Sequence, residues 1–153
     1  ELTPQQLELQ AEVRAYMAGI MDADLREEMS DPNLNEGGGP VFRRKLEQMG
    51  TDGWIGLSWP ESLGGKNWAP IEQYVFTNEV VGAGFPYPFL TIDAVAPVLA
   101  EHAGEHLQPV VEGIRQGKIV ASIGYSEPDA GTDLGSLKTR AVRDGDDWII
   151  NGQ

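Results

Sequence analysis

The stretch IVASIGYSEPDAGTDLG, residues 119–135, marks the point at which this sequence changes character. Its first half, IVASIGYS, is an apolar run with β-branched residues and is typical of a buried strand. Its second half is crowded with small, turn-forming and acidic residues. Helical periodicity precedes the stretch and a hairpin pattern follows it. We therefore predict a mainly α-helical fold that ends in the first strands of a β-domain.

The loop within this stretch has features of a ligand cradle. Gly131 permits a backbone bend or a close approach that a side chain would block. Ser126 and Thr132 supply hydroxyls, and a bent backbone can turn several N–H groups toward one phosphate or carbonyl oxygen. The acidic residues Glu127 and Asp133 argue against a purely anionic guest. From the residues alone, an ordinary turn and a ligand cradle both stay open.

Upstream of residue 119 the pattern is helical. Thr3 is a predicted N-cap with Pro4 at the first helical position, and apolar residues recur at helical spacing as far as Ile20. Residues 22–40 have no such period and predict a mobile loop or linker. Further helices are predicted over 41–49 with Gly50 as a stop, from residue 70, over 89–102 with a bend at Pro97, and over 105–116.

Two details of these helices are specific enough to test. The helix beginning at Pro70 is predicted to turn one apolar side inward, made of Ile71, Tyr74, Val75 and Val81. Trp54, Trp59, Trp68 and Trp148 are interpreted as core or interface aromatics rather than cofactor stackers.

Downstream, SLKTRAVRDGDDWIINGQ predicts a hairpin about Asp144-Gly145. Asn151-Gly152 is a further turn signal with no strand after it. Because open strand edges are usually covered, we predict that these residues are the front part of a longer chain.

Composition excludes several classes of function. The formal net charge is −13 over 153 residues, which disfavours nucleic acid and anionic membranes as partners. No apolar run reaches membrane-spanning length and no leader pattern is present, so a soluble, cytoplasmic protein is expected. There is no cysteine, and the pair His102 and His106 lacks further ligands, so no metal site is predicted.

Residues 126–133, Ser-Glu-Pro-Asp-Ala-Gly-Thr-Asp, resemble the signature of the acyl-CoA dehydrogenase family, in which a strand runs into a Ser/Thr-Glu-Pro-x-Ala/Gly-Gly-Ser/Thr-Asp loop. Four segments resemble family segments in the same order. They are GLSWPESLGGKNW, PIEQYVFTNEVVGAGFP, the helix end and entry strand IRQGKIVASIGYSEP, and the hairpin RAVRDGDDWIINGQ. The resemblance therefore extends over almost the whole chain.

The resemblance implies an N-terminal helical domain over residues 1–117 and the incomplete start of a middle β-domain over 118–153. The family's C-terminal helical domain is absent from these residues. It also implies an FAD-dependent oxidoreductase of fatty acid metabolism that converts an acyl-CoA to its trans-2-enoyl form. Electron-transfer flavoprotein as acceptor and a homo- or hetero-oligomer, a tetramer or dimer, are further implied.

The resemblance also assigns roles to seven positions, with no catalytic residue among them because the family's base lies in the C-terminal domain. They are Ile123, Tyr125 and Ser126 at the flavin ring, Gly131 and Thr132 at the FAD pyrophosphate, Thr132 again at the substrate's pantetheine arm, and Phe89 and Asp93 at the acyl pocket. Tyr125 departs from the family, which usually has an aliphatic residue there. Residues 1–153 alone are expected neither to hold FAD tightly nor to turn over.

Two other functions stay open from the sequence. Acyl-CoA oxidases and flavin-dependent monooxygenases resemble this front end but react with oxygen. A non-catalytic partner subunit, or a helical interaction module, would keep the fold without the chemistry.

Overall fold

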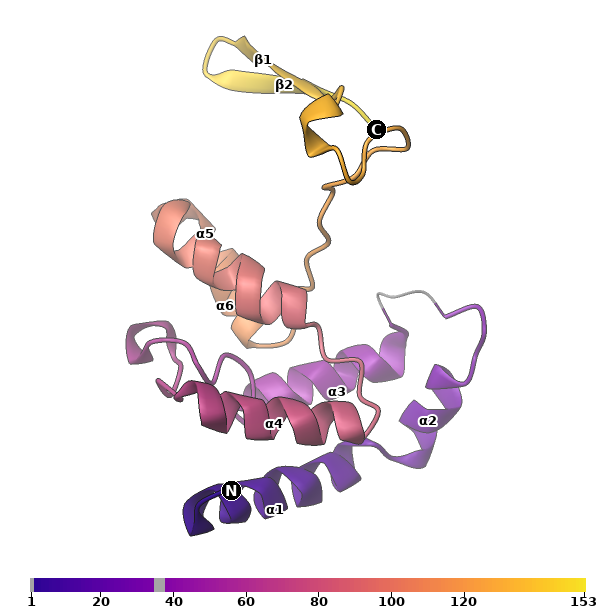
Figure 1. The fold of residues 1–153 in the computed structure, drawn as a ribbon, viewed down its shortest axis with the longest axis vertical. Coiled ribbons are helices and arrows are strands. Elements are labelled where there is room, and N and C mark those ends of the chain that lie inside the picture. Colours follow the sequence, from indigo (N-terminus) through magenta and orange to yellow (C-terminus); the bar gives the residue numbers. More distant parts are fainter. Residues whose placement is uncertain (1, 35–37) are drawn as a thin grey trace. The chain divides into compact units, whose positions relative to one another are not determined.

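The computed structural model describes residues 2–34 and 38–153 and divides the chain into two compact units, residues 1–121 and 122–153 (Figure 1). The first unit is helical and the second holds two antiparallel strands. The α-helices are α1 (Pro4–Ile20), α2 (Ala23–Met29), α3 (Pro40–Thr51), α4 (Pro70–Gly82), α5 (Ala96–His102) and α6 (Gln108–Arg115). A π-helix, η2 (Leu90–Val95), and three short 3-10 turns, η1 (Glu61–Leu63), η3 (Glu105–Leu107) and η4 (Leu134–Ser136), complete the helical elements of the described chain. The strands are β1 (Arg140–Asp144) and β2 (Asp147–Asn151).

Helix α1 begins as its sequence predicts. The Thr3 hydroxyl accepts a hydrogen bond from the Gln6 amide at 3.3 Å, and the Gln6 side chain accepts one from the Thr3 amide at 2.9 Å. This reciprocal capping box satisfies two N–H groups that the first turn of a helix leaves unpaired. The predicted N-cap is confirmed.

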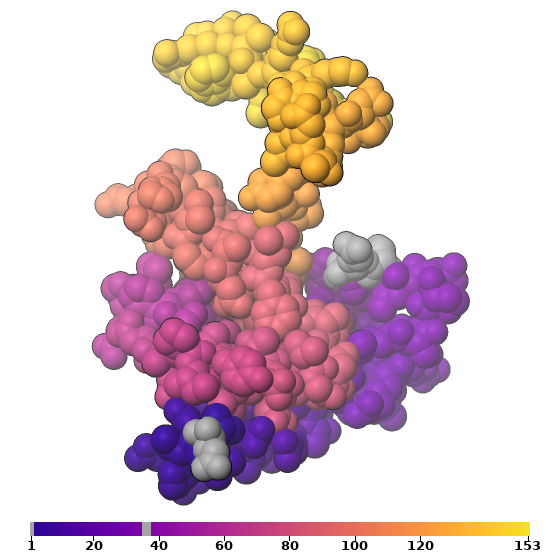
Figure 2. All heavy atoms as spheres, in the orientation of Figure 1, coloured from indigo at the N-terminus to yellow at the C-terminus, as the bar shows by residue number. Residues whose placement is uncertain are grey.

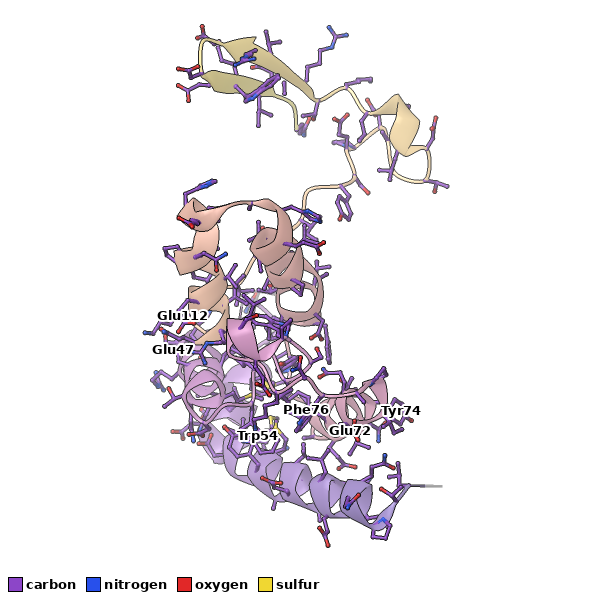
Figure 3. All side chains as sticks on the ribbon, turned by 90° about the vertical axis from the view of Figure 1, so that its left-hand side faces the viewer. Glu47, Trp54, Glu72, Tyr74, Phe76 and Glu112 are labelled. Atoms are coloured by element: carbon purple, nitrogen blue, oxygen red, sulfur yellow. The ribbon has the colours of Figure 1, made fainter. Side chains whose placement is uncertain are left out.

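The core of the helical unit forms where α1 and α4 lie side by side and the aromatic residues between the helices meet (Figure 1). Trp54 and Phe76 are stacked with ring centroids 5.8 Å apart, and both point into the interior in Figure 3. The space-filling view in Figure 2 shows this unit as a continuous body from α1 to α6. Trp54 and Trp59 are buried and Trp68 packs against the core, as predicted, whereas Trp148 is 61% exposed.

The prediction of a loop over residues 22–40 is wrong for its first part, which forms α2. Asp22 caps this helix by accepting from the Leu25 amide at 3.0 Å. Glu28 then reaches α3, where its carboxylate accepts from the amides of Val41 at 2.8 Å and Phe42 at 2.7 Å. Because Gly39, the N-cap of α3, has no side chain, a residue of α2 supplies the cap. Residues 35–37 lie outside the described residues.

Gly50 is not a helix stop, because α3 continues to Thr51. A Cβ at Gly50 would overlap the backbone of Gln116, the residue after α6. Gly117 has a φ of +70°, and a Cβ there would overlap the backbone of Leu46. The two glycines therefore allow the ends of α3 and α6 to approach each other closely.

The predicted inward face of α4 is confirmed for Val75 and wrong for its other three residues. Ile71, Tyr74 and Val81 are exposed by 40%, 61% and 56%, and the buried residues are Val75, Phe76, Glu79 and Val80. Tyr74 points away from the interior in Figure 3. Apolar residues occur on more than one face of α4, so their spacing alone does not choose the buried one.

Glu79 can lie on this buried face because side chains of α1 pair with its carboxylate. Its carboxylate accepts from Arg14 at 2.9 Å through both Nε and a terminal nitrogen, and from the Gln10 side-chain amide at 2.8 Å. The hydrogen bond from Arg14 lowers the pKa of Glu79 and outweighs the opposing effect of its burial. A carboxylate with a bidentate arginine and an amide is thereby accommodated at 9% exposure.

The second unit contains the hairpin, with Asp144 opposite Asp147 and Gly145-Asp146 as a two-residue turn. Gly145 has a φ of +63°, a conformation that favours glycine, and the predicted hairpin is confirmed. The predicted strand over 119–126 does not form. A strand needs a hydrogen-bonding partner, and the described chain pairs only β1 with β2.

No helix among the described residues is both long and apolar enough to cross a bilayer.

Candidate functional site

The loop after Ser126 opens with a tight turn. Glu127 N donates to Ala130 O at 2.8 Å and Ala130 N donates to Glu127 O at 3.1 Å, so Pro128 and Asp129 form the bend. Ala130, 3% exposed, is the buried end of this turn. The Glu-Pro-Asp-Ala sequence therefore builds a rigid corner directly after the extended segment.

Glu127 fastens this corner to the segment that precedes β1. Its carboxylate accepts from the amides of Lys138 at 2.8 Å and Thr139 at 2.6 Å. Hydrogen bonds from Thr139 and then from the Lys138 amide lower the pKa of Glu127. Lys138 also pairs with Asp129 at 3.0 Å on the exposed surface. The contacts of Glu127 therefore give it a structural role, which is to hold the conformation of this loop.

After this turn, residues 131–139 are all exposed to solvent. Gly131 has an ordinary, negative φ, and a Cβ built on it meets no atom within 4 Å. The backbone bends at Gly131 and Thr132, as predicted, and there is also room for a close approach. Within the described chain the Thr132 hydroxyl has no hydrogen-bond partner, and the residue is exposed. An open glycine backbone beside a free hydroxyl fits the pyrophosphate of a dinucleotide.

The three predicted flavin-ring residues lie in the extended segment before the turn. Ile123 is half-buried, whereas Ser126 is exposed and Tyr125 is 69% exposed. They belong to the same unit as Gly131 and Thr132, so the structure gathers all five predicted cofactor residues in residues 122–153. The hydroxyls of Ser126 and Thr132 lie at the two ends of the loop, and both can donate hydrogen bonds to an FAD group.

The two predicted acyl-pocket residues belong to the helical unit, around the π-helix η2. Phe89 immediately precedes η2, and its ring meets that of buried Tyr87 edge-on with centroids 5.0 Å apart. Asp93 lies within η2 and is exposed as a whole residue, although neighbouring atoms shield part of its carboxyl group from water. Partial removal of its carboxyl from water raises the pKa of Asp93, and its charge adds to burial in raising that of Tyr87.

Sequence reasoning missed the π-helix and the residues that hold it. Residues 89–102 were expected to form one bent helix, but η2 and α5 differ in hydrogen-bonding pattern. Trp59 donates from Nε1 to Ile92 O at 3.0 Å, and the Thr91 hydroxyl exchanges hydrogen bonds with the backbone of Ala121. Pro97 was the available signal, because its missing N–H disturbs the carbonyls before it. π-Helical turns are frequent at functional sites.

The family model for the acyl-CoA dehydrogenase N-terminal domain matches residues 3–110. Acyl-CoA dehydrogenase FadE26 of Mycobacterium tuberculosis is 47% identical over 152 residues, which cover 99% of this chain and 38% of that protein. The crystal structure of the ChsE4-ChsE5 complex from M. tuberculosis superposes with a TM-score of 0.89 at 44% identity, over 99% of this chain and 38% of that one. The Tcur3481-Tcur3483 steroid ACAD superposes with a TM-score of 0.87 at 44% identity, over 99% and 39%.

The chain thus spans well under half the length of these relatives, and it matches them from one end of its sequence to the other. Its capped first helix, its Trp-Pro-Glu-x-x-Gly-Gly loop and its Ser-Glu-Pro-x-Ala-Gly-Thr-Asp corner all lie within the matched residues. The chain belongs to the acyl-CoA dehydrogenase family.

Proposed function

We propose that the whole protein carrying this chain is an FAD-dependent acyl-CoA dehydrogenase. In this reaction a carboxylate outside residues 1–153 takes the α-proton of the acyl thioester and the β-hydrogen leaves with its electron pair as hydride, so that a trans-2-enoyl thioester forms. FAD supplies the hydride acceptor when it is bound, and an electron-transfer flavoprotein then takes the electrons. The observation that carries the proposal is the open Gly131 corner held by Glu127, in a chain of this family.

Within this proposal, residues 122–153 hold part of the cofactor. Ile123, Tyr125 and the Ser126 hydroxyl contact the flavin ring, and Gly131 with Thr132 meets the pyrophosphate. Thr132 also contacts the pantetheine arm of the substrate. Glu127 and Lys138 do not touch the cofactor but keep the loop open toward it. The exposure of this loop supports the proposal, because a cofactor can reach its amides and hydroxyls.

We infer that the acyl group carries a bulky ring system. The support is the similarity to a steroid ACAD at 44% identity over nearly the whole chain. Phe89 offers an apolar contact and Asp93 a polar one at the wall of the acyl pocket, which suits an acyl group larger than a simple straight chain. The cytoplasm is the proposed location and a mixed oligomer the proposed assembly.

Flavin content and bleaching test the proposal. The whole protein, purified with its partner subunit if it has one, is titrated anaerobically with a steroid side-chain acyl-CoA. Bound FAD whose absorbance falls on titration, with one enoyl-CoA formed per flavin reduced, is the expected result. Rapid reoxidation of that flavin by air, without electron-transfer flavoprotein, would instead identify an oxidase or monooxygenase.

A second candidate is a non-catalytic partner subunit, and the ChsE4-ChsE5 complex favours it because that structure contains two different subunits. In this case the whole protein would contribute to a site whose base comes from its partner. A carboxylate at the base position of the remaining sequence supports the dehydrogenase. Replacing that carboxylate by glutamine abolishes turnover if this subunit is catalytic and leaves turnover intact if it is the silent partner.

A further inference from the structure

The π-helix η2 has a gap in its hydrogen bonding that its own backbone cannot fill. The Ala96 amide donates to Thr91 O, five residues back, as in a π-helix. By the same pattern the Ile92 carbonyl would accept from residue 97, which is Pro97 and has no N–H. A buried carbonyl without a donor is unfavourable, so a group from another part of the chain has to supply one.

Trp59 supplies that donor. Its indole Nε1–H donates to Ile92 O at 3.0 Å across 33 residues of sequence, and its side chain is 2% exposed. The loop around it is shaped for the indole, because a Cβ at Gly56 would lie 2.7 Å from Trp59 Cδ2 and one at Gly65 would overlap the Trp59 carbonyl. Two glycines of the loop thus keep the space that this tryptophan needs.

Thr91 makes a second tie at the neighbouring position of η2. Its hydroxyl donates to Ala121 O at 3.1 Å and accepts from Ala121 N at 3.0 Å, and the side chain is 1% exposed. Successive residues of the π-helix are therefore bound to two distant segments of the helical unit. Phe89 lies two residues before this pair and Asp93 one residue after it.

We propose that Trp59 is a positioning residue that fixes η2 and so sets the places of Phe89 and Asp93 in the wall of the acyl pocket. Trp59 does not touch the substrate; it acts through the Ile92 carbonyl. Binding of bulky acyl groups that reach this wall depends on the hydrogen bond between Trp59 and Ile92. Binding of short straight chains that end before the wall does not. The inference rests on the proposed function of the whole protein as an acyl-CoA dehydrogenase.

The test compares Trp59→Phe with Trp54→Phe in the whole protein. Both variants shorten a buried aromatic side chain, but the Trp54 indole donates no hydrogen bond within the described residues. Trp59→Phe removes the donor of the buried Ile92 carbonyl and so destabilises η2. The Ala96–Thr91 hydrogen bond should then open more often, and hydrogen exchange of the Ala96 amide should speed up about tenfold or more. Trp59→Phe should also raise KM for a steroid side-chain acyl-CoA several-fold, with kcat and the KM for butyryl-CoA nearly unchanged. Trp54→Phe should leave the Ala96 amide and this selectivity as they are.

Thr91→Val and Thr91→Ser form a second pair that serves if Trp59→Phe does not fold. Valine removes the hydroxyl at nearly constant volume and should reproduce the selective rise in KM, whereas serine should restore the parent value.

Faster exchange with KM unchanged for both substrates would overturn the positioning role and leave a structural one. Unchanged exchange in Trp59→Phe would overturn the tie itself. A parent protein that reduces no flavin with any acyl-CoA contradicts the proposed function, and the exchange result still judges the tie.

Discussion

The helical unit and the unit of residues 122–153 differ in what holds them in shape. Large apolar side chains from several helices pack into the core of the first, with Phe76, Leu46 and Ile92 at 1% exposure or less. In the second, every residue of β1 and β2 is exposed and Ala130 is the buried hydrophobic residue. Its loop is held instead by the hydrogen bonds of Glu127. The helical unit is therefore held in shape by packing of apolar side chains. The loop after Ser126 is held by polar contacts, which leave its backbone accessible to a ligand.

The largest effect should come from the core of the scaffold. Phe76→Ala removes a fully buried ring that stacks on Trp54, and we expect it to lower the free energy of unfolding by about 3–5 kcal/mol. Tyr74→Ala on the same helix removes a ring that is 61% exposed and should change that free energy by less than about 0.5 kcal/mol. Urea unfolding of both variants measures the difference. Equal losses would mean that packing does not distinguish the two faces of α4.

The next effect is pH-dependent and belongs to Glu79. Its folded pKa is lowered, chiefly by the hydrogen bond from Arg14, so its stabilising contribution is present above the unfolded value of 4.5 and is lost as pH falls through the folded pKa. Glu79→Gln should therefore be less stable than the parent at neutral pH, and the gap should close on acidification below 4.5. Denaturation at a series of pH values measures the gap. A gap that does not vary with pH contradicts the ion pair.

A smaller and local effect is expected in the second unit. Glu127→Gln weakens the acceptor of the Lys138 and Thr139 amides, so both should exchange hydrogen faster while amides of α1 and α4 keep their protection. Hydrogen exchange resolved to single amides measures this. Glu105→Gln, on the exposed turn η3, is the matched control because the same charge is removed elsewhere. Loss of protection throughout the helical unit would contradict the separation between the two regions.

The smallest effect on folding should come from Gly131→Ala, because the added methyl group meets no atom within 4 Å and φ is ordinary. We expect unfolding to change by less than about 0.5 kcal/mol. FAD affinity of the whole protein should nevertheless fall about tenfold or more, because the methyl group occupies the space of the close approach. Gly124→Ala is the comparison variant, because Gly124 is also open and unstrained and lies in the same unit. Gly53→Ala would be a poor control, because the positive φ of Gly53 makes any substitution there strained. Unchanged affinity in Gly131→Ala would remove the pyrophosphate role of this glycine.

Where the sequence carried a local signal, the fold could be predicted. The Thr3 cap and the Pro70 start of α4 are examples, and the Gly145 turn is another. Each depends on residues within a few positions of one another, so no knowledge of the rest of the molecule is needed.

Where a distant partner decides the structure, prediction failed. The apolar run 119–126 reads as a strand but finds no strand to pair with in the described chain. The burial of Glu79 depends on Arg14, which lies 65 residues away on another helix, and no local pattern indicates that pairing. The π-helix depends on Trp59, a donor 33 residues away from Ile92. The cofactor residues themselves could be assigned only through the family signature, because their spacing alone also fits an ordinary turn.

The most direct test of the account is FAD binding to the whole protein with its loop intact and with Gly131→Ala, measured by flavin fluorescence in the same titration. We expect tight binding by the parent, bleaching of the bound flavin by a ring-bearing acyl-CoA, and weakened binding by Gly131→Ala even though its unfolding is unchanged. A parent protein that binds no FAD, with or without a partner subunit, would contradict the proposed cofactor site.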